Sequence, residues 1–323
     1  MNDALSQPKE ELTFSGRLIY SDTLNYALIR HWLSIERSDV EDEQSDSNLE
    51  TISINLVDIE SRVVIRWPRW KPAFVALSYV WGNIGGTARD FQDKHGEEQL
   101  PERCSRTIED AITVTKNLGY RYLWVDLYCM SRDPAVRREQ IAQMGVIYKS
   151  APVTIIAPGE DADYGLPGVS RPRNPQIFYQ SKDLCMISMQ LDPLHDLESS
   201  KYSTRGWTYQ EKLFAHRSLV FMDDQVFMES PEELYAESFF APLRWRTQSA
   251  PWARDRQLQI HSDLFDEQQY FDKKGGMAQR TNGAFHGPGY IGLFQRHVQQ
   301  YTRRALSYDS DALNAFQAVL EKF

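Results

Sequence analysis

Three short apolar runs, separated by segments of helical periodicity, organise the middle of the chain. The runs are Phe74–Tyr79, Tyr122–Val125 and Val153–Ala157, and unbroken apolar runs of this length are typical of strands covered on both faces. Between them, 107–118 and 133–148 carry apolar residues at helical spacing. Strand, helix, strand, helix, strand is the alternation that predicts an α/β fold with a mainly parallel sheet flanked by helices.

Local signals mark the ends of these two helices. Thr107 and Asp110 have the spacing of a capping pair at the start of the first helix, and Gly119 is suited to end it. Asp133 followed by Pro134 is an N-cap and first-turn pair for the second helix. We therefore expect one helix to begin at 107 and another, continuous to 148, to begin after Asp133.

Residues 1–73 are expected to form a strand-rich entry layer packed on this core. Arg17–Ile35 is predicted to be extended, as are Ile52–Leu56 and Val63–Trp67. The acidic segment Ser38–Glu50 has almost no apolar residues and is predicted to be a solvated loop.

After the third run the pattern loosens, and the expected elements are shorter. They are strands at 176–179 and 184–189, a helix at 204–213, a hairpin of 218–222 with 225–229, and helices at 291–306 and 309–322. The domain division that follows is an entry layer at 1–73, a central domain at 74–230 and a mostly helical C-terminal extension at 231–323.

Charge and composition restrict the function. The chain has 323 residues and 36 Lys and Arg against 45 Asp and Glu, for a net charge of −9, which argues against nucleic-acid binding because phosphate-binding domains usually carry a basic excess. No apolar run approaches the roughly 18 residues of a membrane helix, and the first residues lack a secretory signal. We expect a cytoplasmic protein that binds neither nucleic acid nor membrane.

The sequence gives little support for a metal site or for disulfide bonds. Three cysteines without CxxC spacing and seven scattered histidines match neither a disulfide framework nor a metal site. The chain also lacks the phosphate-binding loop and the GxSxG nucleophile elbow, and GNIGG at 82–86 does not have the GxGxxG arrangement of a dinucleotide fold. No metal or resident cofactor is therefore expected.

Two places carry candidate chemistry. Ser78 and Tyr79 end the first apolar run and Asp126 follows the second, and ligands of open parallel sheets bind at the carboxyl ends of the strands. Trp207 and Glu211 are four residues apart, so they share a helix face, where an indole can desolvate a carboxylate or stack a flat ligand. Alternatively, Asp126 caps a loop or pairs with an arginine, and Trp207 is a core anchor beside a solvated glutamate.

Several blocks of the sequence resemble, in order, those of the fungal heterokaryon incompatibility domain. The blocks are ALSYVWG at 76–82, IEDAITVTKNLGYRYLWVDLYCM at 108–130, QIAQMGVIYKSAPVTIIA at 140–157, GLPGVS at 165–170 and RGWTYQEKLFAHR at 205–217. Asn83, Met130 and Ser131 depart from the family's usual residues. This resemblance implies a filamentous-fungal protein of non-self recognition and programmed cell death, which associates with itself or with another incompatibility protein.

A more distant resemblance is to Toll/interleukin-1 receptor (TIR) domains, whose sheet is flavodoxin-like. It is carried by the Leu77-Ser78-Tyr79 triplet at the end of a first strand, Asp126 after the second, and the Trp207-to-Glu211 spacing. In the enzymatic members of that group the glutamate serves cleavage of NAD+ between nicotinamide and ribose. The connection between Ala157 and Thr204 is much longer here, so the correspondence is partial.

The second resemblance implies a site and a reaction. Glu211 would be the catalytic residue, with NAD+ as substrate, and the substrate-binding residues would be Ser78, Tyr79, Trp81, Asp126, Arg205 and Trp207. A carboxylate suits this reaction, because nicotinamide leaves without protonation and the ribosyl cation must be stabilised. Two other hypotheses remain open, a non-catalytic module of death signalling that acts by homotypic contacts, and an α/β hydrolase of another nucleotide.

Overall fold

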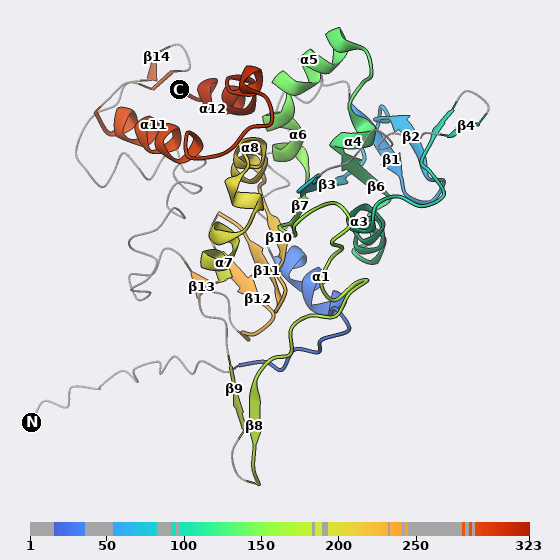
Figure 1. Cartoon of the computed structure of the whole chain (residues 1–323), viewed down its shortest axis with the longest axis vertical. Helices are drawn as coiled ribbons and strands as arrows, with labels where there is room; N and C mark the ends of the chain where they lie inside the picture. The colour runs from blue at the N-terminus through green and yellow to red at the C-terminus, as the bar shows by residue number, and fades with distance from the viewer. Residues whose placement is uncertain are drawn as a thin grey trace, which may run out of the picture.

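A large central sheet with helices on both faces forms the body of the protein in the computed structural model (Figure 1). The structure describes residues 16–35, 54–82, 92–94, 97–182, 185–188, 193–231, 233–240, 243–244, 280–281, 284–285 and 288–323. The acidic segment predicted to be a solvated loop lies outside the described residues, as does Asn83.

Four parallel strands form the centre of the sheet. They are β3 (Phe74–Tyr79), β6 (Tyr122–Val125), β7 (Val153–Ala157) and β10 (Ser218–Phe221). They lie side by side in the order β6-β3-β7-β10, and all their residues are buried. The prediction of three buried parallel strands in an α/β fold is confirmed.

Antiparallel strands extend this centre on both sides. Beyond β6 lie β1 (Asn55–Asp58), β2 (Val63–Arg66), β5 (Glu97–Gln99) and β4 (Gln92–Lys94), and beyond β10 lie β11 (Val226–Glu229), β12 (Glu233–Ala236) and β13 (Leu243–Arg244). The predicted hairpin of β10 with β11 is confirmed. The sheet continues past Pro231, while the division of the chain into three domains stays a prediction.

Helices cover the two faces of the sheet. α3 (Arg106–Asn117) connects β3 to its neighbour β6. α5 (Pro134–Ala142) and α6 (Met144–Ser150) connect β6 to β7, which is the neighbour of β3 on its other side. Because right-handed crossovers in opposite directions along a sheet place their helices on opposite faces, α3 lies on one face and α6 on the other. α8 (Trp207–Phe214) packs beside α6.

The helix ends are partly as predicted. Asp133 caps α5 by accepting from the N–H groups of Ala135 and Val136, as expected. The helix expected to run to 148 is instead interrupted at Gln143. α3 begins after Ser105, and the side chains of Thr107 and Asp110 bind the N–H groups of the Gly-rich loop that follows β7, so they serve tertiary contacts rather than a cap.

The prediction that Arg17–Ile35 is extended is wrong over its second half. Tyr26–Ile35 forms α1, whose buried residues are Ile29, Trp32 and Leu33. The side chain of Asn25 accepts from the N–H of Leu28, 3.0 Å away, which is an N-cap contact. Residues three and four apart share a helix face, so the burial spacing of this segment is helical.

The remaining described elements lie outside the central layers. They are α4 (Asp126–Cys129), the hairpin of β8 (Phe178–Gln180) and β9 (Cys185–Ile187), α7 (Pro193–Ser199), the 3-10 turn η2 (Tyr202–Thr204), the pair β14 (Arg280–Thr281) and β15 (Ala284–Phe285), α11 (Pro288–Tyr301), the 3-10 turns η4 (Asp309–Asp311) and η5 (Asn314–Phe316), and α12 (Gln317–Leu320). The helix expected at 309–322 is therefore broken into three short pieces.

The last part of the chain packs on the helical face formed by α6 and α8 (Figure 1). Ala318 of α12 lies against Gly145 of α6, where an added Cβ would meet the Ala318 Cβ at 2.6 Å. Phe316 stacks on Tyr209 of α8 with ring centroids 6.1 Å apart. Within the described residues, no helix is long and apolar enough to cross a membrane.

Candidate functional site

The candidate site lies where the direction of the strand order reverses. β3 is the first parallel strand in the chain, and its neighbours β6 and β7 are the second and third. The first crossover therefore runs from β3 to β6, and the second runs in the opposite direction, from β6 across β3 to β7. Ser78 and Tyr79 end β3 opposite Ile156 and Ala157 of β7. In sheets of this kind the crevice outside the strand ends at the reversal is the usual ligand site.

Glu211 reaches this point from α8. Its side chain accepts a hydrogen bond from the Ser78 hydroxyl, and the hydroxyls of Ser78 and Tyr202 are 2.7 Å apart. A hydroxyl has one proton to donate, so when Ser78 donates to Glu211, Tyr202 donates to Ser78. The result is a chain of hydrogen bonds that runs from Tyr202 through Ser78 to the carboxylate.

The environment of Glu211 disfavours its charged form. Its side chain is 5% exposed, and this burial, together with the nearby charge of Asp126, raises the pKa of Glu211 from 4.5 to about 7. Hydrogen bonds from Ser78 and Tyr148 and the charge of Arg205 oppose the shift. Among the described residues, no cation forms an ion pair with Glu211, so hydroxyl groups provide most of its stabilisation.

Two further tyrosines surround this carboxyl. Tyr148 lies on α6, and its hydroxyl is 3.4 Å from the carbonyl oxygen of Leu77. Tyr79 is buried, and within the described part of the chain its hydroxyl has no hydrogen-bond partner. Burial raises the pKa of both tyrosines well above the ordinary value, with Glu211 and Asp126 adding to the shift. Both phenols are therefore neutral donors at physiological pH.

Asp126 has partners at the adjacent strand end. One carboxylate oxygen accepts from the indole N–H of Trp81 at 2.9 Å, and the other accepts from the backbone N–H of Leu127 at 2.7 Å. Asp126 is half-buried, and its charge acts on both Tyr79 and Glu211. The structure thus brings Trp81 and Asp126 together beside the Ser78–Glu211 contact.

Trp207 and Arg205 have partners in the C-terminal part of the chain. The indole N–H of Trp207 donates to Asp311 over 3.3 Å. Arg205 forms a bridge with Ala305, and its carbonyl accepts from the guanidinium of Arg304 at 3.2 Å. The predicted spacing of Trp207 and Glu211 is present on α8, but the indole N–H points to the C-terminal segment while the carboxylate points to β3.

The same C-terminal segment holds the turn that precedes α8. The N–H of Ala305 donates to Thr204 at 2.6 Å, and the N–H of Gly206 donates to Ala305 at 2.8 Å. Gly206 has no space for a side chain, because an added Cβ would lie 2.4 Å from Leu306. Residues 304–306 therefore hold the backbone on which Glu211 is mounted.

Two of the residues near Glu211 could not be found from the sequence. Tyr202 lies in a 3-10 turn nine residues before Glu211, and Tyr148 lies on a different helix. Neither has a sequence spacing to Glu211 that indicates a contact, because the tertiary fold makes both contacts. Among the described residues, no group of three or more His, Cys, Asp or Glu could hold a metal ion.

The fold and site define an α/β protein with a buried carboxyl at a strand-order reversal, and comparisons with known proteins identify its class. Residues 74–211 match the model of the family described as heterokaryon incompatibility protein (HET), so the resemblance of this part of the chain to that family is confirmed. The match begins at the first residue of β3 and ends at Glu211.

A curated relative supports this assignment over a shorter stretch. Heterokaryon incompatibility protein 6, OR allele, from Neurospora crassa is 29% identical over 104 residues. The similar region covers 28% of this chain and 15% of that protein. No solved structure matches the chain.

Proposed function

We propose that this chain acts in heterokaryon incompatibility and programmed cell death by hydrolysing NAD+ to nicotinamide and ADP-ribose. The match to the HET family and the similarity to Heterokaryon incompatibility protein 6 support the biological role. The partial likeness to TIR domains supports the reaction, together with the flavodoxin-like order of the four parallel strands. The chain would act in the cytoplasm.

One observation carries the catalytic proposal. Glu211 is a buried carboxyl without an ion-pair partner among the described residues, and it lies at the strand ends where α/β sheets bind ligands. Burial raises its pKa to about 7. A buried carboxylate without an ion-pair partner costs stability, and a carboxyl whose pKa is raised in this way at a ligand-binding position is a candidate functional group.

The chemistry needs a single anionic group. Nicotinamide leaves as a neutral base when its bond to ribose breaks, and the electrons of that bond stay with its ring nitrogen. Water then adds to the ribosyl cation and loses a proton, so NAD+ and water give nicotinamide, ADP-ribose and H+. Ionised Glu211 would stabilise the cation, an effect that is large in a site from which water is excluded.

The neighbouring groups have supporting roles in this proposal. Ser78 orients the carboxylate and, with Tyr79, lines the nicotinamide end of the site, where the unpartnered Tyr79 hydroxyl offers a donor. Asp126, held by Trp81, orients the ribose.

The two residues of the RGWTYQE block play different parts. Arg205 supplies positive charge for the phosphates, and Trp207 braces α8 through its contact with Asp311. Because Glu211 is only 5% exposed, the substrate reaches it when the turn 202–206 moves, and this turn is bonded to residues 304–306. In this proposal the described conformation is the closed one.

The test is nicotinamide release from NAD+ by the purified chain, measured by chromatography. We expect release by the wild type and a loss of at least about 100-fold in Glu211→Gln, which keeps the shape and the hydrogen-bond acceptor but removes the charge. The matched control is Glu229→Gln, another buried carboxyl, which pairs with Lys212 of the same helix at 2.6 Å. It should release nicotinamide at close to the wild-type rate.

Two results would contradict the proposal. If the wild type and Glu211→Gln release nicotinamide equally, Glu211 is not the catalytic residue. If the wild type releases no nicotinamide, the chain does not hydrolyse NAD+. In the second case the burial of Glu211 favours the alternative, a non-catalytic module that signals by homotypic contacts. Cell killing by overexpressed Glu211→Gln at the wild-type level would point the same way.

A further inference from the structure

The hairpin of β8 and β9 carries a concentration of exposed apolar side chains. It extends away from the body of the protein, and its two strands form a separate sheet (Figure 1). Four of its large hydrophobic side chains are more than half exposed: Ile177 at 78%, Phe178 at 57%, Tyr179 at 58% and Met186 at 53%. Two-stranded hairpins that expose apolar residues are marginal in water, and such patches usually mark interaction sites.

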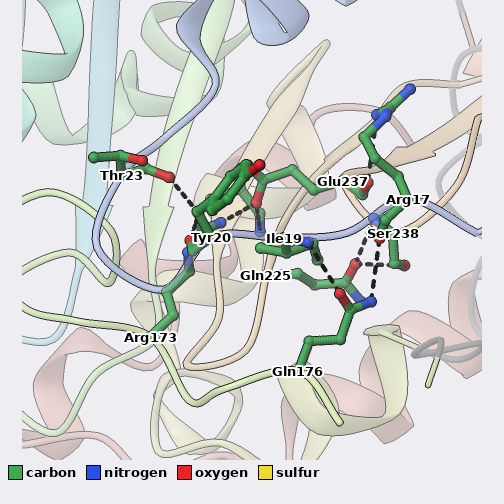
Figure 2. A network of polar contacts seen from close by, with 10 residues as sticks. Arg17, Ile19, Tyr20, Thr23, Arg173, Gln176, Gln225, Glu237 and Ser238 are labelled. Atoms are coloured by element: carbon green, nitrogen blue, oxygen red, sulfur yellow. Dashed lines mark hydrogen bonds and ion pairs between the residues drawn. The ribbon is translucent and has the colours of Figure 1, made fainter. Parts of the chain in front are cut away.

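Polar contacts fix the base of this hairpin to the body. The side chain of Gln176 accepts from the N–H of Ile19 at 2.9 Å and donates to the carbonyl of Arg17 at 3.2 Å (Figure 2). It also donates to the carbonyl of Ser188 at the end of the opposite strand, 2.8 Å away. These contacts hold both strands at their base, so the hairpin presents its apolar residues in a defined position.

The register shows which backbone groups of β8 face away from β9. The N–H of Ser188 donates to the carbonyl of Ile177 at 2.8 Å, and Tyr179 lies opposite Met186. Hydrogen-bonded and non-bonded pairs alternate along antiparallel strands, so Ile177 and Tyr179 bond inward to β9. The N–H and C=O groups of Phe178 and Gln180 therefore point outward, along the free edge of the hairpin.

We infer that this edge of β8 is a self-association surface, to which a second copy of this chain binds through its own β8. Antiparallel pairing about a two-fold axis at Tyr179 places Phe178 of each copy opposite Gln180 of the second copy. Each outward N–H then meets an outward C=O, which gives about four backbone hydrogen bonds. An edge that is complementary to itself under a two-fold axis favours a second copy over an unrelated partner.

The side chains fit the same arrangement. Tyr179 and Met186 lie on one face of the hairpin, and pairing about the axis places the two Tyr179 rings side by side, with both Met186 side chains next to them. Lys182 is the only charged residue in 176–182 and 185–188. The edge Ile177–Gln180 thus lacks the charged residues and proline with which exposed strands usually prevent pairing.

The contact is small, which sets the expected affinity. Burying the exposed parts of these side chains in both copies removes on the order of 700 Å² from water, below the roughly 1,200 Å² of a standard stable interface. We therefore expect a weak dimer with a dissociation constant in the micromolar range, populated when the chain is locally concentrated.

The experiment is sedimentation velocity of the full chain over a range of micromolar concentrations, with three variants of Tyr179 and Leu313. Tyr179→Lys and Tyr179→Glu each place two like charges opposite one another across the axis, so each alone should remain monomeric at every concentration. Mixed together, they place Lys opposite Glu and should restore a dimer. The control is Leu313→Lys, which changes a 74% exposed residue far along the chain and should dimerise as the wild type does.

A fourth variant separates the edge from the side chains. Phe178→Pro removes an outward N–H that the hairpin itself does not use, so it should abolish dimerisation and leave the thermal unfolding midpoint near that of the wild type. A wild type that stays monomeric throughout, or a mixture of the two Tyr179 variants that does not associate, would overturn the proposal. The proposal would also be overturned if Leu313→Lys weakened dimerisation as much as Tyr179→Lys does.

Discussion

Two buried glutamates in this molecule have opposite environments. Glu237 is 3% exposed and contacts the guanidinium of Arg173, whose other nitrogen donates to the carbonyls of Tyr20 and Thr23 at 2.6 and 2.5 Å (Figure 2). Glu211 is 5% exposed, and its nearest partners in the described chain are hydroxyl groups.

This difference separates a structural role from a chemical one. Glu237 ties the N-terminal segment to the sheet through a cation and the N–H of Val226. Burial raises the pKa of Glu237 too, but here the charge of Arg173 opposes the shift directly through an ion pair. Among the described residues, Glu211 has no ion-pair partner, and hydrogen bonds with the charge of Arg205 compensate its charge only in part. A charged substrate or transition state can compensate it further. Burial alone therefore does not identify a catalytic carboxyl, and the partner of the carboxyl must be considered.

The largest expected loss of stability comes from breaking the Arg173–Glu237 ion pair. Arg173→Met leaves Glu237 buried without its cation, and breaking one half of a buried pair costs about 3–5 kcal/mol in the free energy of unfolding. Urea denaturation monitored by circular dichroism measures this loss. The double variant Arg173→Met, Glu237→Leu should recover much of the loss, since it leaves no unpaired charge. If both variants are equally unstable, the ion pair is not the cause.

The next effect is the pH dependence that Glu211 gives to stability. Its pKa is raised from 4.5 when unfolded to about 7 when folded, so between these values the folded state binds more protons and the free energy of unfolding falls as pH rises. The penalty is absent below pH 4.5 and complete above pH 7, where it is roughly 3 kcal/mol. Glu211→Gln should therefore be more stable than the wild type at pH 8 and equal to it at pH 4.

The matched variant for this experiment is Glu229→Gln, whose carboxyl contacts Lys212 at 2.6 Å. Between pH 4 and pH 8, Glu229→Gln should not gain stability relative to the wild type as Glu211→Gln does. A wild type and a Glu211→Gln variant that keep a constant difference across this range would show that Glu211 keeps an ordinary pKa.

A smaller loss of stability is expected from Ser78→Ala. The variant removes the donor to Glu211 and leaves the hydroxyl of Tyr202 without its contact, and an unsatisfied buried group costs about 1–3 kcal/mol. Since Ser78 lowers the pKa of Glu211, its loss should move that pKa upward. Unfolding at pH 5 and at pH 8 measures both changes, and an unchanged pH dependence would contradict the second.

The smallest expected effect is that of Trp207→Phe. The variant keeps an aromatic ring but removes the N–H that donates to Asp311 over 3.3 Å, a part-buried contact worth about 1 kcal/mol or less. Nicotinamide release should stay near the wild-type rate, because the indole N–H does not point to Glu211. A loss of release as large as that of Glu211→Gln would show that the indole contacts the substrate.

The sequence predicted the elements that depend on local pattern. The runs at β3, β6 and β7 are apolar on both faces, and Asp133–Pro134 marks a helix start that the structure contains. The helix α1 was missed although its buried residues have helical spacing. The burial of β12 and its place in the sheet depend on pairing with β11, which a local pattern does not reveal.

For the site, the sequence brought forward Ser78 and Glu211, which the structure places in contact. It could not predict the hydroxyl of Tyr202 or the direction of the Trp207 indole, because both depend on how the turn before α8 and the C-terminal segment pack together. The roles of the candidate residues in a reaction stay predictions.

Among the described residues Glu211 has no ion-pair partner at the strand ends, and the most direct test of this environment is a titration of its carboxyl. Carbon-13 NMR of protein labelled at the glutamate carboxyls, with Glu211→Gln used to assign the signal, follows its protonation from pH 4 to pH 9. A midpoint near 7 is expected, in line with the burial of the group. A midpoint near 4.5 would show that the carboxyl is solvated or paired, and would contradict the account.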